Sequence, residues 1–345
     1  MRANHGPLPE SLTASSVRRR SSWWRRAARF TGRSVVAVLA LVTVTSLVFN
    51  AVTTPPPTLP APSGADLVVG GTRVHYQRWG THGPPLVLVH GFAESSVAWG
   101  PAAELLARDH VVYAVDLAGY GYTDFTGRYA LGDQVDLVDA FVRRLGLDHP
   151  VLIGHSMGAA VVGGVALAHP SDIGGIVFVD GDGLPFANGS TGSGSAGGGS
   201  GPARWILRSP YGISAYRLLT RSARLDDRLI RSNCGATCLG LTPELVEAWM
   251  RPMRQGAAEA ALPAMAANGV LSLSPDQLRA IRVPRAIIWG ELDLRSGGSL
   301  DDARHDLGEP PTMVIPGAGH LAMLGDPVTF AADVEQVTAG MSAAH

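Results

Sequence analysis

The sequence has no lysine, so arginine carries all of its side-chain positive charge apart from histidine. The 28 arginines are offset by 29 acidic residues, which leaves a formal net charge of −1 at pH 7. Binding to nucleic-acid phosphates requires a basic surface. We therefore expect no nucleic-acid partner for the chain as a whole.

Cysteine is scarce, and paired metal-binding motifs are missing. Cys234 and Cys238 are the only cysteines, and no histidine or cysteine has the HExxH or CxxC spacing. Such spacings are typical of bound zinc. We predict that the protein uses neither a metal ion nor an organic cofactor.

Charged residues are also absent between Arg33 and Asp66, where a long apolar run occurs. A helix over 35–52 would be about 27 Å long, close to the hydrocarbon thickness of a bilayer. Seven arginines crowd between residues 18 and 33, before the run. Because positive residues collect on the cytoplasmic side, this pattern predicts a basic cytoplasmic tail (1–33), a transmembrane helix (34–52) and an extracytoplasmic remainder.

Two other interpretations of the apolar run compete with a membrane anchor. A cleaved secretory signal would release the protein, but no A-x-A-like cleavage site follows the run. A buried core helix is disfavoured by the flanking arginines and by the proline-rich segment that follows. That segment, within residues 53–65, cannot pair as a strand, and we interpret it as a semi-stiff linker.

From Asp66 onward, short apolar runs alternate with stretches of helical spacing. A hairpin is predicted around Gly70 and Gly71. Apolar runs that are typical of fully buried strands follow, in the segments PLVLVHG, VVYAVDLAG, VLIGHS, GGIVFVDG, PRAIIWGELD and TMVIPGAGH. Strands alternating with helices predict an α/β fold with a mostly parallel sheet covered on both faces.

The segment GHSMG, residues 154–158, lies between a predicted strand and a predicted helix. A sharp turn there requires Gly154 and Gly158, because a Cβ atom at either position would collide with the neighbouring strand or helix. Such a turn exposes the Ser156 hydroxyl as a nucleophile and aims the Met157 N–H at the reacting carbonyl. The motif alone is weak evidence in a chain with 42 glycines, but its strand-to-helix context strengthens it.

Partners for the serine follow other predicted strands. His320 comes just after the last strand, where it can act as a general base. Asp293 follows the penultimate strand and is predicted to hold the imidazole, with Asp180 as the alternative acid. His90 and Gly91 end an earlier strand, so the Phe92 N–H is the second candidate oxyanion donor, and we expect His90 to order this loop through hydrogen bonds.

With these motifs in order, the chain resembles the α/β-hydrolase family, in its serine esterase and lipase branch, over roughly Asp66 to Gly340. The resemblance rests on HGF at 90–92, DLAGYGYTD from Asp116, GHSMG, WGELD and GAGH. It implies an eight-stranded sheet with a helical cap inserted after the sixth strand. It also implies Ser156 as nucleophile, Asp293 as acid and His320 as base.

The insert, residues 182–281, divides the predicted hydrolase core into 66–181 and 282–340. It begins with a low-complexity Gly/Ser-rich stretch and continues with helical segments that would form a lid over the serine. Cys234 and Cys238 fall in this cap. Their i, i+4 spacing allows a disulfide in an oxidising compartment, and two free buried thiols are the alternative.

Together these features predict a membrane-anchored serine hydrolase that acts outside the cytoplasm on small-molecule or lipid esters through an acyl-enzyme. Thioester, amide and carbon–carbon bond hydrolysis, acyl transfer and perhydrolase chemistry use the same groups. A ligand-binding module without catalysis is the alternative of a different class. The sequence does not indicate an oligomeric state.

Overall fold

The computed structural model describes residues 14–181, 202–268, 271–293 and 300–341. The chain divides into two compact units, residues 1–53 and 54–345. Most of the predicted basic tail has no described side chains, and the Gly/Ser-rich stretch lies outside the described residues.

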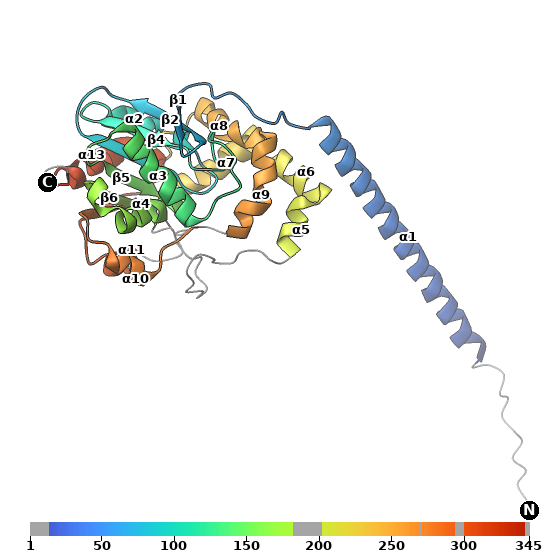
Figure 1. Ribbon diagram of the computed structural model, residues 1–345. Coiled ribbons are helices and arrows are strands. Elements are labelled where there is room, and N and C mark those ends of the chain that lie inside the picture. Colours follow the sequence, from blue (N-terminus) through green and yellow to red (C-terminus); the bar gives the residue numbers. More distant parts are fainter. Residues whose placement is uncertain (1–13, 182–201, 269–270, 294–299, 342–345) are drawn as a thin grey trace, which may run out of the picture. The chain divides into compact units, whose positions relative to one another are not determined.

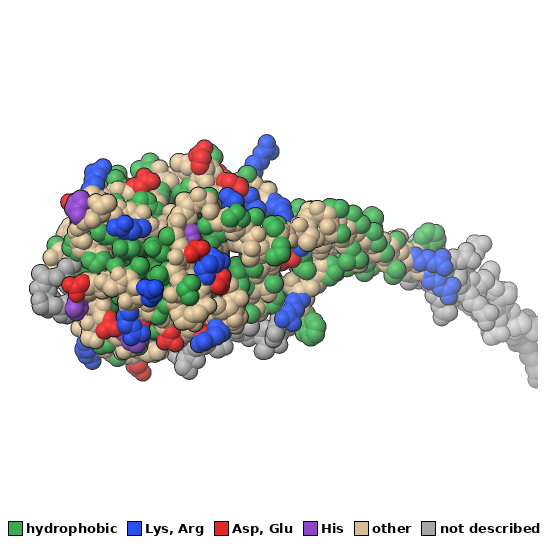
Figure 2. Space-filling view, turned by 45° about the horizontal axis from the view of Figure 1, so that its top comes forward, with side chains coloured by type: hydrophobic (Ala, Val, Ile, Leu, Met, Phe, Trp, Pro, Cys, Tyr) green, Lys and Arg blue, Asp and Glu red, His purple; other side chains and the backbone are tan. Residues whose placement is uncertain are grey.

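The described part of the first unit forms one helix, α1 (Ala14–Val52), of 39 residues. Helix α1 begins well before the predicted transmembrane span, 34–52. The arginine-containing stretch from Ala14 onward has no proline, and its first glycine is Gly32, so nothing there breaks the helix. Within α1, residues Arg29–Val52 have a mean hydropathy of 2.4. By length and composition, α1 is the only helix in the described part of the chain that could cross a membrane. Hydrophobic side chains cover its visible surface, with arginines only toward its N-terminal end (Figure 2).

The second unit is built on one eight-stranded sheet, which confirms the predicted α/β architecture. The spatial order is β1-β2-β4-β3-β5-β6-β7-β8. Strand β2 is antiparallel to both of its neighbours, and the remaining pairs are parallel. The strands are β1 (Ala65–Val69), β2 (Thr72–Trp79), β3 (Pro85–Val89), β4 (Val111–Val115), β5 (Val151–His155), β6 (Gly175–Val179), β7 (Arg285–Gly290) and β8 (Thr312–Ile315).

Helices cover both faces of the sheet and enclose two apolar cores (Figure 1). Every residue of β5 and β6 is buried, as expected for central parallel strands. On one face lie α3 (Leu131–Leu145), α4 (Met157–Ala168), α10 (Pro275–Ala280) and α11 (Leu300–Asp306). On the other lie the 3₁₀ turn η1 (Ser96–Trp99), α2 (Gly100–Leu106), α12 (Ala322–Gly325) and α13 (Pro327–Thr338).

A helical insert separates β6 from β7, at the position predicted for the cap. Its helices are α5 (Pro202–Arg208), α6 (Pro210–Leu219), α7 (Ala223–Cys234), α8 (Pro243–Met250) and α9 (Gly256–Asn268), with the turn η3 (Pro252–Arg254). The last helix before β7 is α10, and it packs against α4 and α11 of the core. We use "cap" below for α5 to α9.

Part of the proline-rich linker is hydrogen-bonded to the cap. The backbone N–H groups of Gly256 and Ala257 donate to the carbonyls of Pro56 and Pro57, at 2.8 and 2.9 Å. The side chain of Gln255 accepts from the Leu59 N–H at 2.9 Å. Proline lacks an N–H but keeps its carbonyl as an acceptor, so a segment that cannot form a strand still binds the first turn of α9.

Candidate active site

Ser156 occupies a strained turn between β5 and α4. Its φ of 50° is unusual for a residue with a side chain. A Cβ atom at Gly154 would lie 2.4 Å from the Gly158 carbonyl oxygen, and one at Gly158 would lie 2.2 Å from that of Val89. Glycine at both positions therefore lets strand and helix approach closely enough to form the turn.

The structure brings three of the predicted residues into one hydrogen-bonded chain. The Ser156 Oγ atom lies 3.1 Å from His320 Nε2, and His320 Nδ1 lies 2.9 Å from Asp293 Oδ2. The Asp293 side chain is fully buried, whereas His320 is partly exposed. In this arrangement the imidazole can take the serine proton while the carboxylate stabilises the imidazolium.

Asp180, the alternative acid, faces other groups. Its carboxylate accepts hydrogen bonds from the backbone N–H groups of Gly290, at 2.5 Å, and Ala322, at 3.2 Å. Burial and the nearby charge of Asp293 raise its pKa well above the ordinary value for aspartate. Asp180 therefore ties the end of β7 to the segment after His320, and Asp293 is the carboxylate in contact with the imidazole.

The loop after β3 carries His90, Gly91 and Phe92. His90 is buried, and its Nδ1 lies 2.8 Å from the Gly91 carbonyl while its Nε2 accepts from the Leu117 N–H at 3.1 Å. Burial lowers the pKa of His90, which favours the neutral ring that this bonding pattern needs. Through these two contacts His90 joins the loop after β3 to the loop after β4.

Glu94 and His155 form a buried ion pair directly beneath this loop. His155 Nδ1 lies 3.0 and 3.1 Å from the two carboxylate oxygens of Glu94. The carboxylate also accepts from the Gly91 N–H at 2.9 Å, and His155 Nε2 lies 2.6 Å from the backbone carbonyl of His320. The pair thus connects the candidate oxyanion loop to the backbone of the histidine that contacts Ser156.

Opposing effects set the pKa values of this pair. Burial lowers the pKa of His155, but the charge and hydrogen bond of Glu94 outweigh it and raise the value to about 9. Burial likewise raises the pKa of Glu94, but the charge of His155 together with the hydrogen bonds from His155 and the Gly91 N–H outweighs it, so the pKa lies below its usual range. Both groups are therefore charged near neutral pH.

An apolar cavity of about 500 Å³ opens onto Ser156 and His320. Core residues Phe92 and Tyr120 line one side, and cap residues including Leu219, Leu229 and Trp249 line the other. The indole N–H of Trp249 donates to the Ala93 carbonyl at 3.0 Å, which joins the cap to the oxyanion loop. The volume is within the range that small-molecule ligands occupy.

One group of possible metal ligands occurs among the described residues, away from Ser156. Donor atoms of Asp139, His169 and Asp172 lie within 4.8 Å of one another. Asp139 already pairs with Arg143 and lies 3.7 Å from His169, so this group is explained as an ion-pair cluster. It lies at the far end of α4, about 18 Å along the helix from Ser156.

The site geometry and the sheet order agree with a comparison against protein families. The profile of the alpha/beta hydrolase family matches residues 86–333 of this chain. The chain belongs to this family. The match includes Ser156, Asp293 and His320 together with the whole cap, and it agrees with the resemblance inferred from the motifs.

Curated relatives show a range of hydrolase reactions. The chain is 36% identical over 99 residues to N-formylmaleamate deformylase of Pseudomonas putida, a match covering 28% of this chain and 37% of the relative. It is 26% identical over 247 residues to 2-(acetamidomethylene)succinate hydrolase of Mesorhizobium japonicum, covering 69% and 82%. Matches to the first four relatives span only 22% to 37% of their lengths.

Solved structures share the fold of this alpha/beta hydrolase. A bacterial membrane phospholipase A aligns over 92% of this chain and 98% of its own, with a TM-score of 0.62 and 22% identity. A serine hydrolase of carbazole degradation aligns over 80% and 99%, with a TM-score of 0.64 and 19% identity. At these identities the likeness establishes the fold alone.

Sequence reasoning missed Glu94 and the bonding of His155. Both were visible beside predicted site residues, since Glu94 follows the HGF motif and His155 precedes the serine. A carboxylate two positions after a candidate oxyanion donor was the available signal. Their contact joins residues that are 61 positions apart in the sequence, and no periodicity or spacing reveals such a contact.

Proposed function

We propose that this alpha/beta hydrolase is a membrane-anchored serine hydrolase that cleaves carboxylic esters or lipid-type substrates outside the cytoplasm. The observation that carries the proposal is the hydrogen-bonded chain from Ser156 through His320 to Asp293, which lies at an apolar cavity.

The proposed reaction proceeds through an acyl-enzyme. Ser156 Oγ attacks the ester carbonyl as His320 Nε2 takes its proton, and the imidazolium then protonates the departing alcohol. Backbone N–H groups of Phe92 and Met157 stabilise the oxyanion. Met157 opens α4, and N–H groups in the first turn of a helix have no intrahelical acceptor. Water activated by His320 releases the acid.

The cavity favours a neutral, apolar substrate. Among the described residues that line it, none is an arginine, and the chain has no lysine. Glu94 lines the cavity, but its charge is paired with that of His155 at 3.0 Å. Two relatives are named for a maleamate and a succinate, both acids. Because no described arginine lines the cavity and the charge of His155 is already paired with Glu94, we propose esters with apolar acyl chains instead.

Three observations support the membrane anchor and a lipid-type substrate. The span Arg29–Val52 is apolar and only 6% buried. Arginines precede it, and the next charged residue after Arg33 is Asp66. Only three residues separate the end of α1 from Pro56, whose carbonyl is bonded to the cap. Such a segment reaches at most about 14 Å, so an anchored α1 would keep the cap close to the bilayer.

The activity is tested on the full chain in detergent micelles, with a fluorophosphonate probe and a series of p-nitrophenyl esters. We expect labelling and turnover in the parent, with both lost in Ser156→Ala and His320→Ala. Ser171→Ala, which changes an exposed serine bonded only to neighbouring Asp172, is the matched control and keeps both. Labelling that persists in Ser156→Ala would disprove the proposed nucleophile.

The location is tested by fractionation and protease protection. We expect the full chain in the membrane fraction after carbonate washing, with its C-terminal domain digested by protease added outside intact cells. Recovery of the uncleaved chain in the soluble fraction after gentle lysis would contradict the anchor. A secreted chain that starts beyond residue 52 would support the cleaved-signal alternative.

A further inference from the structure

The C-terminal end of cap helix α7 is hydrogen-bonded to the backbone on both sides of His320. The Gly319 N–H donates to the Cys234 carbonyl at 2.6 Å, and the Leu321 N–H donates to the Asn233 carbonyl at 3.0 Å. The last carbonyls of a helix have no partners within it. Here the loop that carries His320 supplies those partners, so the end of α7 fixes the position of the histidine backbone.

The segment after α7 continues along the same loop. We call residues 234–240 the brace. Three more backbone bonds join it to the residues around His320, from the N–H groups of Ala236, Leu239 and Gly240 to the carbonyls of Gly317, Gly325 and Leu324, at 2.7, 3.2 and 2.9 Å. The hydroxyl of Thr237 also donates to the Gly325 carbonyl at 3.1 Å.

The brace and the His320 loop are in direct backbone contact. Gly235 has a φ of 104°, and a Cβ atom there would lie 2.3 Å from the Gly317 carbonyl oxygen. With no side chain between them, a change in the path of the brace moves the His320 loop directly.

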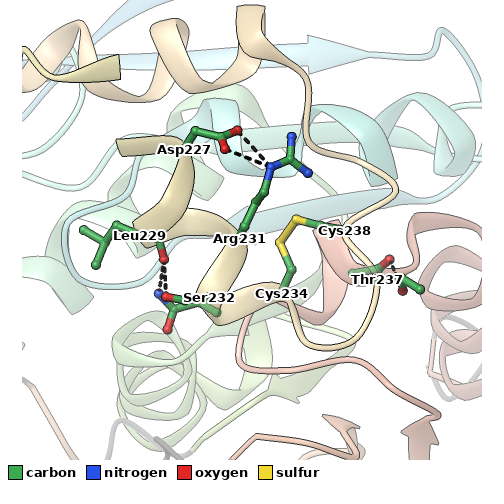
Figure 3. Close-up of a disulfide and its surroundings, with 9 residues drawn as sticks. Asp227, Leu229, Arg231, Ser232, Cys234, Thr237 and Cys238 are labelled. Carbon is green, nitrogen blue, oxygen red and sulfur yellow. Dashed lines mark hydrogen bonds and ion pairs between the residues drawn. A yellow bond between two sulfur atoms is a disulfide. The ribbon is translucent and has the colours of Figure 1, made fainter. Parts of the chain in front are cut away.

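A disulfide closes the brace. Cys234 and Cys238 are bonded through their sulfur atoms, with their Cα atoms 5.2 Å apart (Figure 3). Cys234 is fully buried and Cys238 is partly exposed. The bond holds the residues after α7 in a tight turn, which returns Leu239 and Gly240 to the His320 loop.

We propose that the Cys234–Cys238 disulfide is a redox-dependent positioning element for His320, so that the enzyme is fully active only when this bond is formed. The inference rests on the proposed function of His320 as the general base. The cytoplasm keeps thiols reduced, whereas the proposed location of the catalytic domain is oxidising. The bond therefore restricts full activity to protein that has crossed the membrane.

Dithiothreitol opens the bond in two balanced steps. One of its thiolates attacks the more accessible sulfur of Cys238 and releases the Cys234 thiolate, which takes up a proton. The second thiol of the reagent then displaces Cys238, and the products are two cysteine thiols and the cyclic disulfide of the reagent. Because the sequence has no other cysteine, the reagent has no other target in the chain.

The experiment compares the oxidised and reduced full chain in detergent. We expect reduction to lower kcat and the rate of fluorophosphonate labelling by on the order of 10-fold, because a small displacement of a reacting group costs that much or more. KM changes by less than about 2-fold, since the cavity wall is retained. Near-UV circular dichroism stays close to that of the oxidised protein, and oxidised glutathione restores kcat.

Two variants separate positioning from general stabilisation. Cys238→Ser cannot form the bond, and we expect the low kcat of the reduced parent with or without reductant. Ser232→Ala changes a neighbouring exposed residue whose hydroxyl donates only to the Leu229 carbonyl within α7. It is expected to keep the parent kcat and the parent response to reductant.

Three outcomes would overturn the inference. The first is an equal kcat for the oxidised parent and for a reduced parent whose two thiols are shown by alkylation to be free. This result would disprove the positioning role of the disulfide and leave the proposed function intact. The second is loss of the near-UV circular dichroism signal on reduction, which would mean that the bond stabilises the whole domain and has no specific effect on His320. An oxidised parent that neither labels nor turns over esters would disprove the proposed function and this inference with it.

Discussion

The buried pair of Glu94 and His155 predicts how the stability of this protein changes with pH. Glu94→Gln removes the charge but keeps the hydrogen bonds. The amide oxygen can accept from the Gly91 N–H, and the amide N–H can donate to Nδ1 of a neutral His155. The substitution therefore isolates the effect of the proton that His155 carries in the parent.

The direction of the change in stability with pH follows from the pKa of His155, which is about 9 in the folded protein against an ordinary value of 6.5. Between these values the folded state holds one proton more than the unfolded state, so raising the pH favours unfolding. The slope is about 1.4 kcal/mol per pH unit, which gives a loss of about 3 kcal/mol across the interval. This stability is fully present below pH 6.5 and is lost as the pH rises through 9.

The assay is chemical denaturation of the full chain in detergent at several pH values from 6 to 9.5, followed by tryptophan fluorescence. The free energy of unfolding of the parent should fall by about 3 kcal/mol more than that of Glu94→Gln. Other titrating groups contribute equally to both proteins, so the difference between the two curves reports on the pair. If the free energies of unfolding of the two proteins changed in parallel with pH, the charged state assigned to His155 would be refuted.

Glu94→Ala provides the upper bound. It removes one partner of a buried ion pair and leaves the Gly91 N–H without its acceptor, so we expect a loss of about 3–5 kcal/mol near pH 7. Glu94→Gln should cost clearly less at the same pH. Equal losses for the two variants would show that the lost charge accounts for the whole cost, and that the volume and hydrogen bonds which Glu94→Gln keeps contribute nothing.

Further predictions concern the acid, the turn and the linker. Asp293→Asn should lower kcat by about 10³- to 10⁴-fold with little change in unfolding, whereas Asp180→Asn should lower the unfolding midpoint and leave most of kcat. The reverse result would assign the acid to Asp180. Gly158→Ala should destabilise the fold by about 3 kcal/mol or more, because its Cβ would lie 2.2 Å from the Val89 carbonyl oxygen. A denaturation midpoint equal to that of the parent would contradict the close approach. Gln255→Ala removes bonds to the linker, to a core loop and within the cap. The substitution should lower the free energy of unfolding by about 1–3 kcal/mol and raise KM more than it lowers kcat. Unchanged ester kinetics would argue against a link between the linker and the cavity.

Local patterns predicted the order of elements and much of the candidate site. The strands were recognisable because central parallel strands are buried on both faces and read as continuous apolar runs. Ser156, Asp293 and His320 were predicted as site residues because each lies within five residues of the end of a strand, and the carboxyl ends of parallel strands meet at one edge of a sheet. These features depend on residues that are neighbours in the sequence.

The tertiary structure decided what depends on contacts between distant segments. It placed Asp293 and not Asp180 beside His320, although both follow strands, because Asp180 binds the backbone N–H groups of Gly290, on the neighbouring strand, and Ala322. It paired Glu94 with His155 and brought the disulfide-closed brace against the His320 loop. No sequence period encodes such contacts, since they arise when the sheet and cap bring together backbone groups that must find hydrogen-bond partners once buried.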